Sequence, residues 1–305
     1  MKYFFVFIAI IFLFSLFIWQ AIFLPKDLGF QGEAVFLINK GQGLEKIASE
    51  LEEQGLIKNR YFFMVYIFTR KSATDLKAGQ YQLSSSMTIA EIAEKIISGD
   101  RIKRILTVIE GWTVKDIQEL LKDKPGTVPL ESEGYLFPDT YEIFPDDSVE
   151  EIVEMMKANF ERKLSSAMRE EIASQGRTIS EIVIMASLIE KEVRTFEDKK
   201  IVSGILWKRL KVGMPLQVDA TIIYITGKRT VRISIEETRI DSPYNTYKYP
   251  GLPVGPICNP GLESIKAAIE PEESEYWYYL SAPDGTTIFS KNLQEHNLAK
   301  AKYLK

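Results

Sequence analysis

The sequence predicts an α+β protein in which an N-terminal apolar helix precedes a small α+β subdomain and a larger domain of mixed helices and strands. The chain opens with one long apolar run, and residues 33–109 alternate short strand patterns with amphipathic helices. Residues 110–305 combine long helical patterns with a hairpin signal near the C-terminus. With 305 residues, 46% of them hydrophobic, the chain is long enough for more than one core.

The apolar run extends from Tyr3 to Leu24 and contains only Ser15 and Gln20 as polar residues. About 20 apolar residues are enough to cross the hydrocarbon core of a bilayer. A cleaved signal peptide has a shorter apolar region and a small-residue cleavage site. We therefore expect an uncleaved transmembrane anchor over residues 1–24, followed by a short Gly-containing linker over residues 25–32.

The flanking charges favour one orientation of this anchor. Lys2 and the amino terminus lie on one side of the run, whereas Lys26 on the other side is offset by Asp27. The positive-inside tendency then places the N-terminus inside. The sequence predicts a single-pass protein of the cytoplasmic membrane with nearly all of its mass extracytoplasmic.

Residues 33–109 are expected to form the small α+β subdomain. Strands are predicted at Glu33–Ile38, Gln80–Leu83 and Ile102–Ile109, and helices at Leu44–Leu56 and Thr88–Ile97. Gly41-Gln42-Gly43 lacks the Lys-Ser/Thr sequel of a phosphate loop, so it indicates a strand-to-helix turn. The strand, the run Gly-Gln-Gly-Leu-Glu-Lys-Ile-Ala and the helix together resemble a LysM-type glycan-binding module. A structural spacer is the alternative interpretation.

Residues 110–305 are expected to form a second, larger domain. A helix should start at Thr113, and an irregular aromatic loop is predicted over Glu133–Tyr141 because its Gly and Pro disfavour regular structure. Further helices are predicted at Val149–Ala173, Ile179–Val193, Lys199–Leu210 and Glu263–Ile269, with a final helix that carries His296 near its start. Tyr276–Leu280 and Thr286–Ser290 read as strands joined by the turn Pro283-Asp284-Gly285.

Composition excludes several kinds of chemistry. The net charge of -4 supplies no general basic face, so no nucleic-acid partner is expected. The single cysteine excludes an internal disulfide, and the single histidine excludes a zinc site built on several imidazoles. A Ser-His-Asp system would have to use His296, and no Gly-x-Ser-x-Gly context supplies its serine. We therefore expect carboxylate chemistry without a metal or another cofactor.

Two candidate acids end the apolar helix Ile179–Val193. At about 100° per residue, Glu190 and Glu192 fall on opposite flanks of the buried face, so at most one of them should point into a cleft. The periodicity does not separate the two. The alternative interpretation is an ordinary solvated Glu-Lys-Glu at a helix edge.

The polar loops after Gly213 are suited to a neutral, hydroxyl-bearing ligand, because amide, hydroxyl and phenol groups supply directional hydrogen bonds and aromatic faces. The candidate substrate-binding residues are Gln217, Asp219, Tyr244, Asn245, Thr246, Tyr247, Asn259, His296 and Asn297. Structural alternatives are Pro/Gly-rich turns, an N-cap role for Asp219, packing of the tyrosines and a helix-start role for His296.

Several motifs in this order resemble the endolytic murein transglycosylase (YceG-like) family. They are Met185-Ala186-Ser187-Leu188-Ile189-Glu190-Lys191-Glu192, Leu216-Gln217-Val218-Asp219, Tyr244-Asn245-Thr246-Tyr247, Gly251-Leu252-Pro253, Gly255-Pro256-Ile257, His296-Asn297 and the Glu133–Tyr141 loop. The resemblance covers the whole chain, and it implies that residues 110–305 are the catalytic domain and that this catalytic part is extracytoplasmic. It implies cleavage of peptidoglycan glycan strands near the membrane by a glutamate of this segment. Carried over by position, that residue is Glu192, with Glu190 as the runner-up.

The implied reaction needs only one carboxyl group, which protonates the glycosidic oxygen and then takes a proton from the muramic acid C6 hydroxyl. The resemblance also makes cell-wall synthesis proteins candidate partners. Two alternatives stay open: a carboxylate glycoside hydrolase that uses water, and a non-catalytic membrane-anchored cell-wall binding or scaffolding protein.

Overall fold

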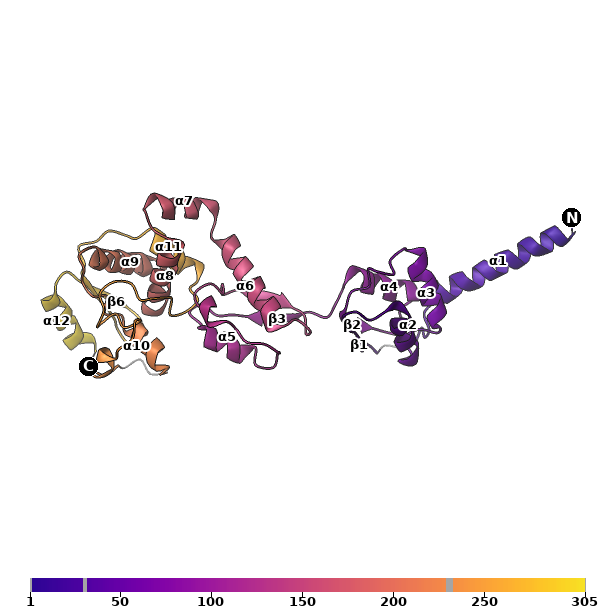
Figure 1. Cartoon of the computed structure of the whole chain (residues 1–305), viewed down its shortest axis with the longest axis horizontal. Helices are drawn as coiled ribbons and strands as arrows, with labels where there is room; N and C mark the ends of the chain where they lie inside the picture. Colours follow the sequence, from indigo (N-terminus) through magenta and orange to yellow (C-terminus); the bar gives the residue numbers. More distant parts are fainter. Residues whose placement is uncertain (1, 30–31, 229–232, 305) are drawn as a thin grey trace. The chain divides into compact units, whose positions relative to one another are not determined.

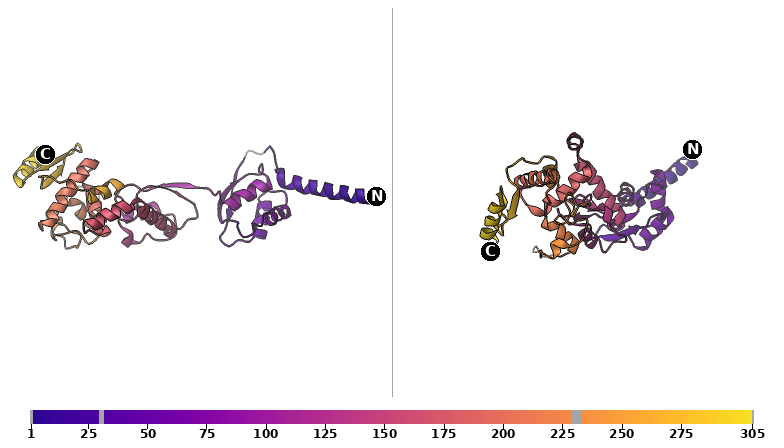
Figure 2. Two further views of the ribbon diagram at one scale, coloured as in Figure 1. Left: turned by 90° about the horizontal axis from the view of Figure 1, so that it is seen from above. Right: turned by 60° about the vertical axis from the view of Figure 1, so that its left-hand side comes forward.

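The computed structural model describes residues 2–29, 32–228 and 233–304. Its helices and strands are mixed along the chain, which confirms the predicted α+β class. The backbone divides into two compact units (Figures 1 and 2). Unit 1 consists of Met1–Ile105 with Glu142–Asp147, and unit 2 consists of Leu106–Tyr141 with Ser148–Lys305.

Unit 1 contains the long apolar helix and a small antiparallel sheet. Its elements are α1 (Lys2–Phe23), β1 (Ala34–Ile38), α2 (Leu44–Glu53), α3 (Arg60–Thr69), β2 (Gly79–Leu83) and α4 (Ile89–Ser98). β1 and β2 pair so that Ala34 lies opposite Leu83 and Ile38 opposite Gly79. The predicted strands and helices are present, and the apolar, aromatic segment between them is helix α3, capped by Asn59.

The core of unit 1 follows from the alternation along β1. Phe36 and Ile38 are fully buried, whereas Val35 and Leu37 on the same strand are exposed. This is the period of two expected when one face of a sheet is covered. Helices α2, α3 and α4 cover that face with buried aliphatic and aromatic side chains, among them Leu51.

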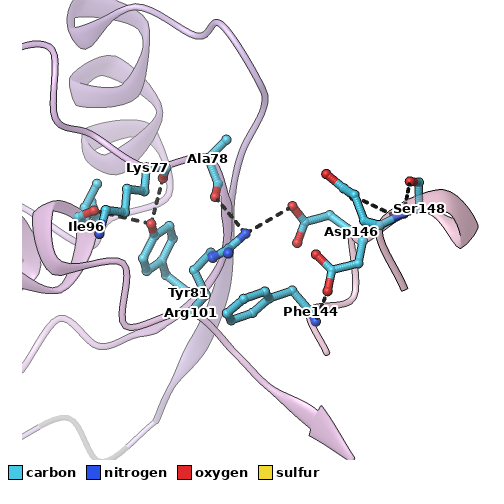
Figure 3. Close-up of polar contacts among 10 residues, drawn as sticks. Lys77, Ala78, Tyr81, Ile96, Arg101, Phe144, Asp146 and Ser148 are labelled. Carbon is cyan, nitrogen blue, oxygen red and sulfur yellow. Dashed lines mark hydrogen bonds and ion pairs between the residues drawn. The ribbon is translucent and has the colours of Figure 1, made fainter. Parts of the chain in front are cut away.

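Unit 1 also includes a segment from much later in the chain, Glu142–Asp147. The guanidinium of Arg101 holds this segment (Figure 3). It lies over the Phe144 ring, 3.4 Å from the centroid, and 3.7 Å from Asp146 Oδ2, and it donates to the Ala78 carbonyl at 3.4 Å. The planar cation thus meets an aromatic face and a carboxylate at once.

β3 (Arg104–Thr107) and β4 (Thr140–Ile143) form a two-stranded sheet. Within each of these strands the chain passes from one unit to the other. β3 is shorter than the predicted strand. The prediction of an irregular loop was wrong at its last two residues, Thr140 and Tyr141, which start β4. The reason is an alternating pattern, in which Tyr141 and Ile143 are buried and their neighbours exposed.

Unit 2 is mainly helical and surrounds α8. Its elements are α5 (Val114–Leu120), α6 (Val149–Lys163), α7 (Ser166–Ser174), α8 (Ile179–Glu192), α9 (Phe196–Lys211), α10 (Asp219–Thr226), α11 (Leu262–Ile269), β5 (Tyr278–Ser281), β6 (Thr287–Ser290) and α12 (Leu293–Tyr303). Helices α7, α9, α10 and α11 all contact α8 (Figure 1). β5 and β6 form the predicted antiparallel hairpin.

Three expectations about these helices were wrong. Residues 149–173 form two helices, because α6 ends at Lys163 and Ser165 caps α7 by accepting from the Met168 N–H. α9 begins at Phe196, earlier than predicted, because Thr195 caps it. The polar region after Gly213 contains α10, whose N-cap is Val218, so Asp219 is the first helical residue rather than the cap.

The helix α8 passes through the core of unit 2. All residues from Ile182 to Ile189 are buried. At its start, Thr178 and Glu181 form a capping box, and at its end Val193 turns to an extended conformation with φ -142°. Glu192 is therefore the last residue of the helix, at the point where the chain leaves the core.

We expect Phe36→Ala to destabilise unit 1 strongly, because it opens a cavity at a fully buried position. Substitutions of this kind cost about 3–5 kcal/mol. The matched control is Val35→Ala on the same strand, where the side chain is 61% exposed and a change within about 0.5 kcal/mol is expected. Urea unfolding of the full chain in detergent measures both, and equal losses would contradict this account of the core.

Candidate active site

The last turn of α8 carries the two acids at the edge of the unit 2 core. Ile189, one residue before Glu190, is completely buried. Glu190 and Glu192 lie on different flanks, as the helical period predicts, and they contact different parts of the chain. Lys191 between them donates to the Gly111 carbonyl at 2.9 Å. The two carboxyl groups consequently have unlike surroundings.

Glu190 is enclosed by partners. Its Oε1 lies 3.4 Å from the Lys199 ammonium, and the two side chains are 9% and 4% exposed. Its Oε2 accepts from the Gly261 N–H at 2.9 Å and from the Ser264 hydroxyl at 2.6 Å. Gly261 is the N-cap of α11, so the carboxylate also meets the positive end of that helix. Glu190 thereby joins α8, α9 and α11.

Glu192 has a different environment. Burial raises the pKa of its carboxyl group to about 7, and the negative charge of Asp219 acts in the same direction. Hydrogen bonds from Tyr279 and from the Ala220 N–H, together with the Arg209 cation, favour the charged form and lower the pKa, without cancelling the effect of burial. Glu192 is only partly buried. It is a carboxyl group that can hold a proton near neutral pH and reach solvent.

The start of α10 lies beside Glu192 and carries further polar groups. The Tyr247 hydroxyl donates to Asp219 Oδ1. Burial, followed by the Asp219 carboxylate, raises the pKa of Tyr247, so this phenol stays a donor. Gln217 has an exposed side chain and a φ of +53°, and its N–H donates to the Thr246 carbonyl at 3.1 Å. A left-handed backbone is uncommon for a residue other than glycine and is typical of functional sites.

Asn245 and Thr246 are buried within the same loop, where their polar atoms are occupied. Asn245 donates to the carbonyls of Thr238 and Ile240 at 3.0 and 2.8 Å, and its Oδ1 accepts from the Tyr247 N–H at 2.9 Å. Thr246 Oγ1 accepts from the Val218 N–H at 3.0 Å. These two side chains hold the loop that presents Tyr247.

Asn259 and Glu133 form a second buried polar group. Asn259 Nδ2 donates to the Trp112 carbonyl at 3.0 Å and to Glu133 Oε1 at 3.2 Å, and its Oδ1 accepts from the Leu136 N–H at 2.9 Å. Glu133 also accepts from Tyr224 on α10 at 3.3 Å. Burial raises the pKa of Glu133 to about 7. The aromatic loop is thereby tied to the helix that carries Asp219.

The remaining predicted residues lie at the edges of this region. The Tyr244 ring packs against Tyr224 with centroids 5.1 Å apart. His296 is buried and stacks on Tyr278, the neighbour of Tyr279, at 5.2 Å. Within the described ranges, no partner is found for His296 Nδ1. Asn297 is exposed on α12.

Sequence reasoning missed Tyr279, Arg209 and Glu133. Arg209 lies at i+3 and i+7 from the buried residues Leu206 and Val202, so a charge on an apolar helical stripe was the available signal. The guanidinium donates to the Leu216 carbonyl at 2.7 Å and to the Trp277 carbonyl at 2.7 and 3.0 Å. Nothing in the spacing of the aromatic strand indicates that Tyr279, rather than its neighbours, meets Glu192.

The fold and the site place this chain among proteins of the YceG-like family, which matches residues 36–302. The chain belongs to that family, which confirms the predicted resemblance. An endolytic murein transglycosylase of Bacillus subtilis (strain 168) is 34% identical over an alignment that covers 88% of this chain and 84% of that protein.

An endolytic murein transglycosylase of Streptococcus pneumoniae serotype 2 is 29% identical over 92% of this chain, which spans 60% of the length of that longer protein. The crystal structure of a yceG-like protein from Listeria monocytogenes superposes with a TM-score of 0.59 at 31% identity, and covers 88% of this chain and 99% of its own. The similarity therefore extends over most of both units.

Removing the carboxyl group of Glu190 should lower the stability of the fold, whereas removing that of Glu192 should raise it. Glu190→Ala leaves the buried Lys199 ammonium without its carboxylate, which typically costs about 3–5 kcal/mol. Glu192→Gln removes a carboxyl group whose raised pKa shows that the fold disfavours its charge. In the parent, the charge on Glu192 destabilises the fold. This effect is absent below the unfolded pKa of about 4.5, grows as the pH rises, and is complete above about pH 7.

We therefore expect Glu192→Gln to be more stable than the parent at pH 8 and equal to it near pH 4. Thermal unfolding of both variants at the two pH values measures this. A loss of stability in Glu192→Gln at pH 8, or none in Glu190→Ala, would contradict the assignment of environments.

Proposed function

We propose that this chain is a membrane-anchored endolytic lytic transglycosylase of peptidoglycan. It would cleave the bond between N-acetylmuramic acid and N-acetylglucosamine within glycan strands and leave 1,6-anhydro-muramic acid ends. The relatives from Bacillus subtilis and Streptococcus pneumoniae are endolytic murein transglycosylases, which supports this activity. The observation that carries the proposal is the Glu192 carboxyl group, partly exposed and with its pKa raised to about 7.

Glu192 is the proposed catalytic residue in preference to Glu190. A general acid needs a proton near the working pH and access to the substrate. Glu190 is paired with Lys199 and accepts two further hydrogen bonds in the interior, so its oxygen atoms are occupied by partners and lie away from solvent. Glu192 meets both requirements.

The proposed reaction uses Glu192 twice. The protonated carboxyl group gives its proton to the glycosidic oxygen while the bond from muramic acid C1 to that oxygen breaks and the sugar becomes oxocarbenium-like. The carboxylate then takes the proton of the muramic acid C6 hydroxyl, whose oxygen bonds to C1. No water enters. An intramolecular nucleophile reaches an effective concentration of about 10⁵ M or more in well-oriented cases, so a second carboxylate is not required.

The polar groups around Glu192 have proposed roles that follow from their exposure. The exposed Gln217 amide and the Tyr247–Asp219 pair would contact acetamido and hydroxyl groups of the sugars. Tyr244 would supply an aromatic wall, and His296 and Asn297 would lie at the outer edge. The buried Asn245, Thr246 and Asn259 would support these contacts by holding the loops.

Anchoring in the cytoplasmic membrane is proposed from α1. Tyr3–Phe23 is long and apolar enough to cross a membrane, and its side chains are almost entirely exposed outside the last turns. An exposed apolar helix of this length has no stable place in water. The charges at its ends favour an N-terminus inside, and the catalytic part would then lie on the side where peptidoglycan is found.

We expect Glu192→Gln to abolish formation of anhydro ends while the fold is preserved, because the amide can neither donate nor accept the transferred proton. General acid-base catalysis contributes at least about 100-fold. The measurement is mass spectrometry of peptidoglycan digested by the full chain in detergent. The matched control is Glu197→Gln, an exposed carboxylate on the next helix, which should retain full activity.

The same digest separates the alternatives. Reducing muramic acid ends in place of anhydro ends would indicate a hydrolase that uses water. Binding without turnover, unchanged in Glu192→Gln, would indicate a scaffold. Full activity of Glu192→Gln with loss in Glu190→Gln would assign the reaction to the first acid.

The rate should fall with increasing pH, because the reaction needs the protonated form of Glu192. We expect the alkaline limb of kcat/KM near pH 7. Tyr279 donates a hydrogen bond that favours the carboxylate, so Tyr279→Phe should raise the pKa of Glu192 and move this limb to higher pH. A shift to lower pH in pH-rate profiles of parent and variant would contradict this geometry.

A further inference from the structure

The outer face of α3 in unit 1 is apolar. Tyr61, Val65 and Phe68 follow the i, i+4, i+7 spacing and so share one side of the helix. They are 58%, 43% and 63% exposed, whereas Phe63 and Ile67 on the other side are buried in the core. α3 contains no acidic residue. Exposed apolar faces of this kind mark interaction surfaces.

This helix packs directly on the C-terminal part of α1. The Phe62 and Phe17 rings meet edge-on with centroids 5.7 Å apart, and the Tyr66 and Phe23 rings do so at 6.2 Å. Ile22 of α1 is buried in the unit 1 core. Because Phe62 meets Phe17 and Tyr66 meets Phe23, the N-terminal end of α3 lies closer to the N-terminus of α1.

The uncovered part of α1 is too short to cross a bilayer. Tyr3–Leu16 is exposed throughout and extends about 20 Å at 1.5 Å per residue. The hydrocarbon core is about 30 Å thick, which the 22 residues of α1 match only as a whole. Phe17–Phe23 must then lie within the apolar layer, and the end of α3 packed on this stretch is carried to the membrane boundary.

The charges around α3 suit the headgroup layer. Lys58 precedes the helix, Arg60 is its first residue, and Arg70 and Lys71 follow it. Arg60 lies 3.9 Å from Glu52 and Arg70 lies 2.7 Å from Glu94, and both guanidinium groups remain partly exposed. The Arg60 guanidinium lies over the Tyr61 ring, 5.1 Å from its centroid. Long basic side chains can keep their stems on apolar surface and extend their charges to phosphates, and aromatic rings favour the membrane interface.

We propose that the N-terminal end of α3 inserts into the boundary between headgroups and acyl chains of an anionic phospholipid membrane, with Tyr61 deeper than Phe68. This inference rests on the proposed anchoring by α1. A single helix leaves a unit free to rotate about the anchor, whereas a second contact holds unit 1 on the membrane in one orientation. The face of unit 1 that carries α3 is then the lipid-facing side.

The test uses the full chain reconstituted in vesicles of phosphatidylcholine and phosphatidylglycerol. An environment-sensitive fluorophore is attached in separate variants at Tyr61→Cys, Phe68→Cys and, as a control, Val212→Cys, which is 60% exposed in unit 2. The native Cys258 is buried and does not compete for the label. We expect a blue shift at position 61, a smaller one at 68 and none at 212, with quenching by spin-labelled lipid in the same order.

Vesicle flotation keeps this inference separate from the anchoring proposal. Protein that does not float with the vesicles contradicts the anchor itself. The protein could instead float while aqueous iodide quenches the label at position 61 as fully as the label at 212. That outcome would overturn the α3 contact alone. Val65→Asp in the Tyr61→Cys background places a charge on the face and should restore iodide access several-fold, and unchanged shielding would also oppose the inference.

Discussion

The burial of α8 is the constraint on which the rest of the site depends. Because residues 182–189 are enclosed on all sides, the last turn of the helix cannot rotate or shift without disturbing the whole core. Glu190 and Glu192 are therefore held on opposite flanks. One carboxylate joins helices through Lys199 and the start of α11. The other lies beside Tyr279, where burial favours its protonated form. The structural role of Glu190 and the proposed catalytic role of Glu192 thus lie about half a turn apart on the same helix.

The loops around the site keep their shape through buried polar side chains rather than through regular structure. Asn245, Thr246 and Asn259 satisfy backbone groups that loops leave without helical or sheet partners. The Glu133 carboxyl group extends this support to α10 through Tyr224. Residues expected to bind sugar directly thus lie one layer behind the proposed binding surface, while Gln217 and Tyr247 form that surface.

In unit 1, the same reasoning connects the anchor to the membrane. The core takes up the last turns of α1, which shortens its free apolar length, and in the proposed arrangement this brings α3 to the lipid boundary. The aromatic content of α3 then has two explanations: one side of the helix packs on the core, and the other side would face lipid if the proposal holds.

The local elements could be predicted because periodicity, caps and turn residues act over a few positions: the apolar helix, the β5–β6 hairpin and α8 all follow from them. The break between α6 and α7 was missed because a single capping serine is a weak local signal, and α10 was missed because its eight residues are too few to show a clear helical period. By itself, the sequence predicted carboxylate chemistry and two candidate acids at the end of an apolar helix. Only the tertiary structure separated the environments of Glu190 and Glu192, because Lys199, Ser264, Arg209 and Tyr279 come from distant parts of the chain, and burial and charge depend on such neighbours.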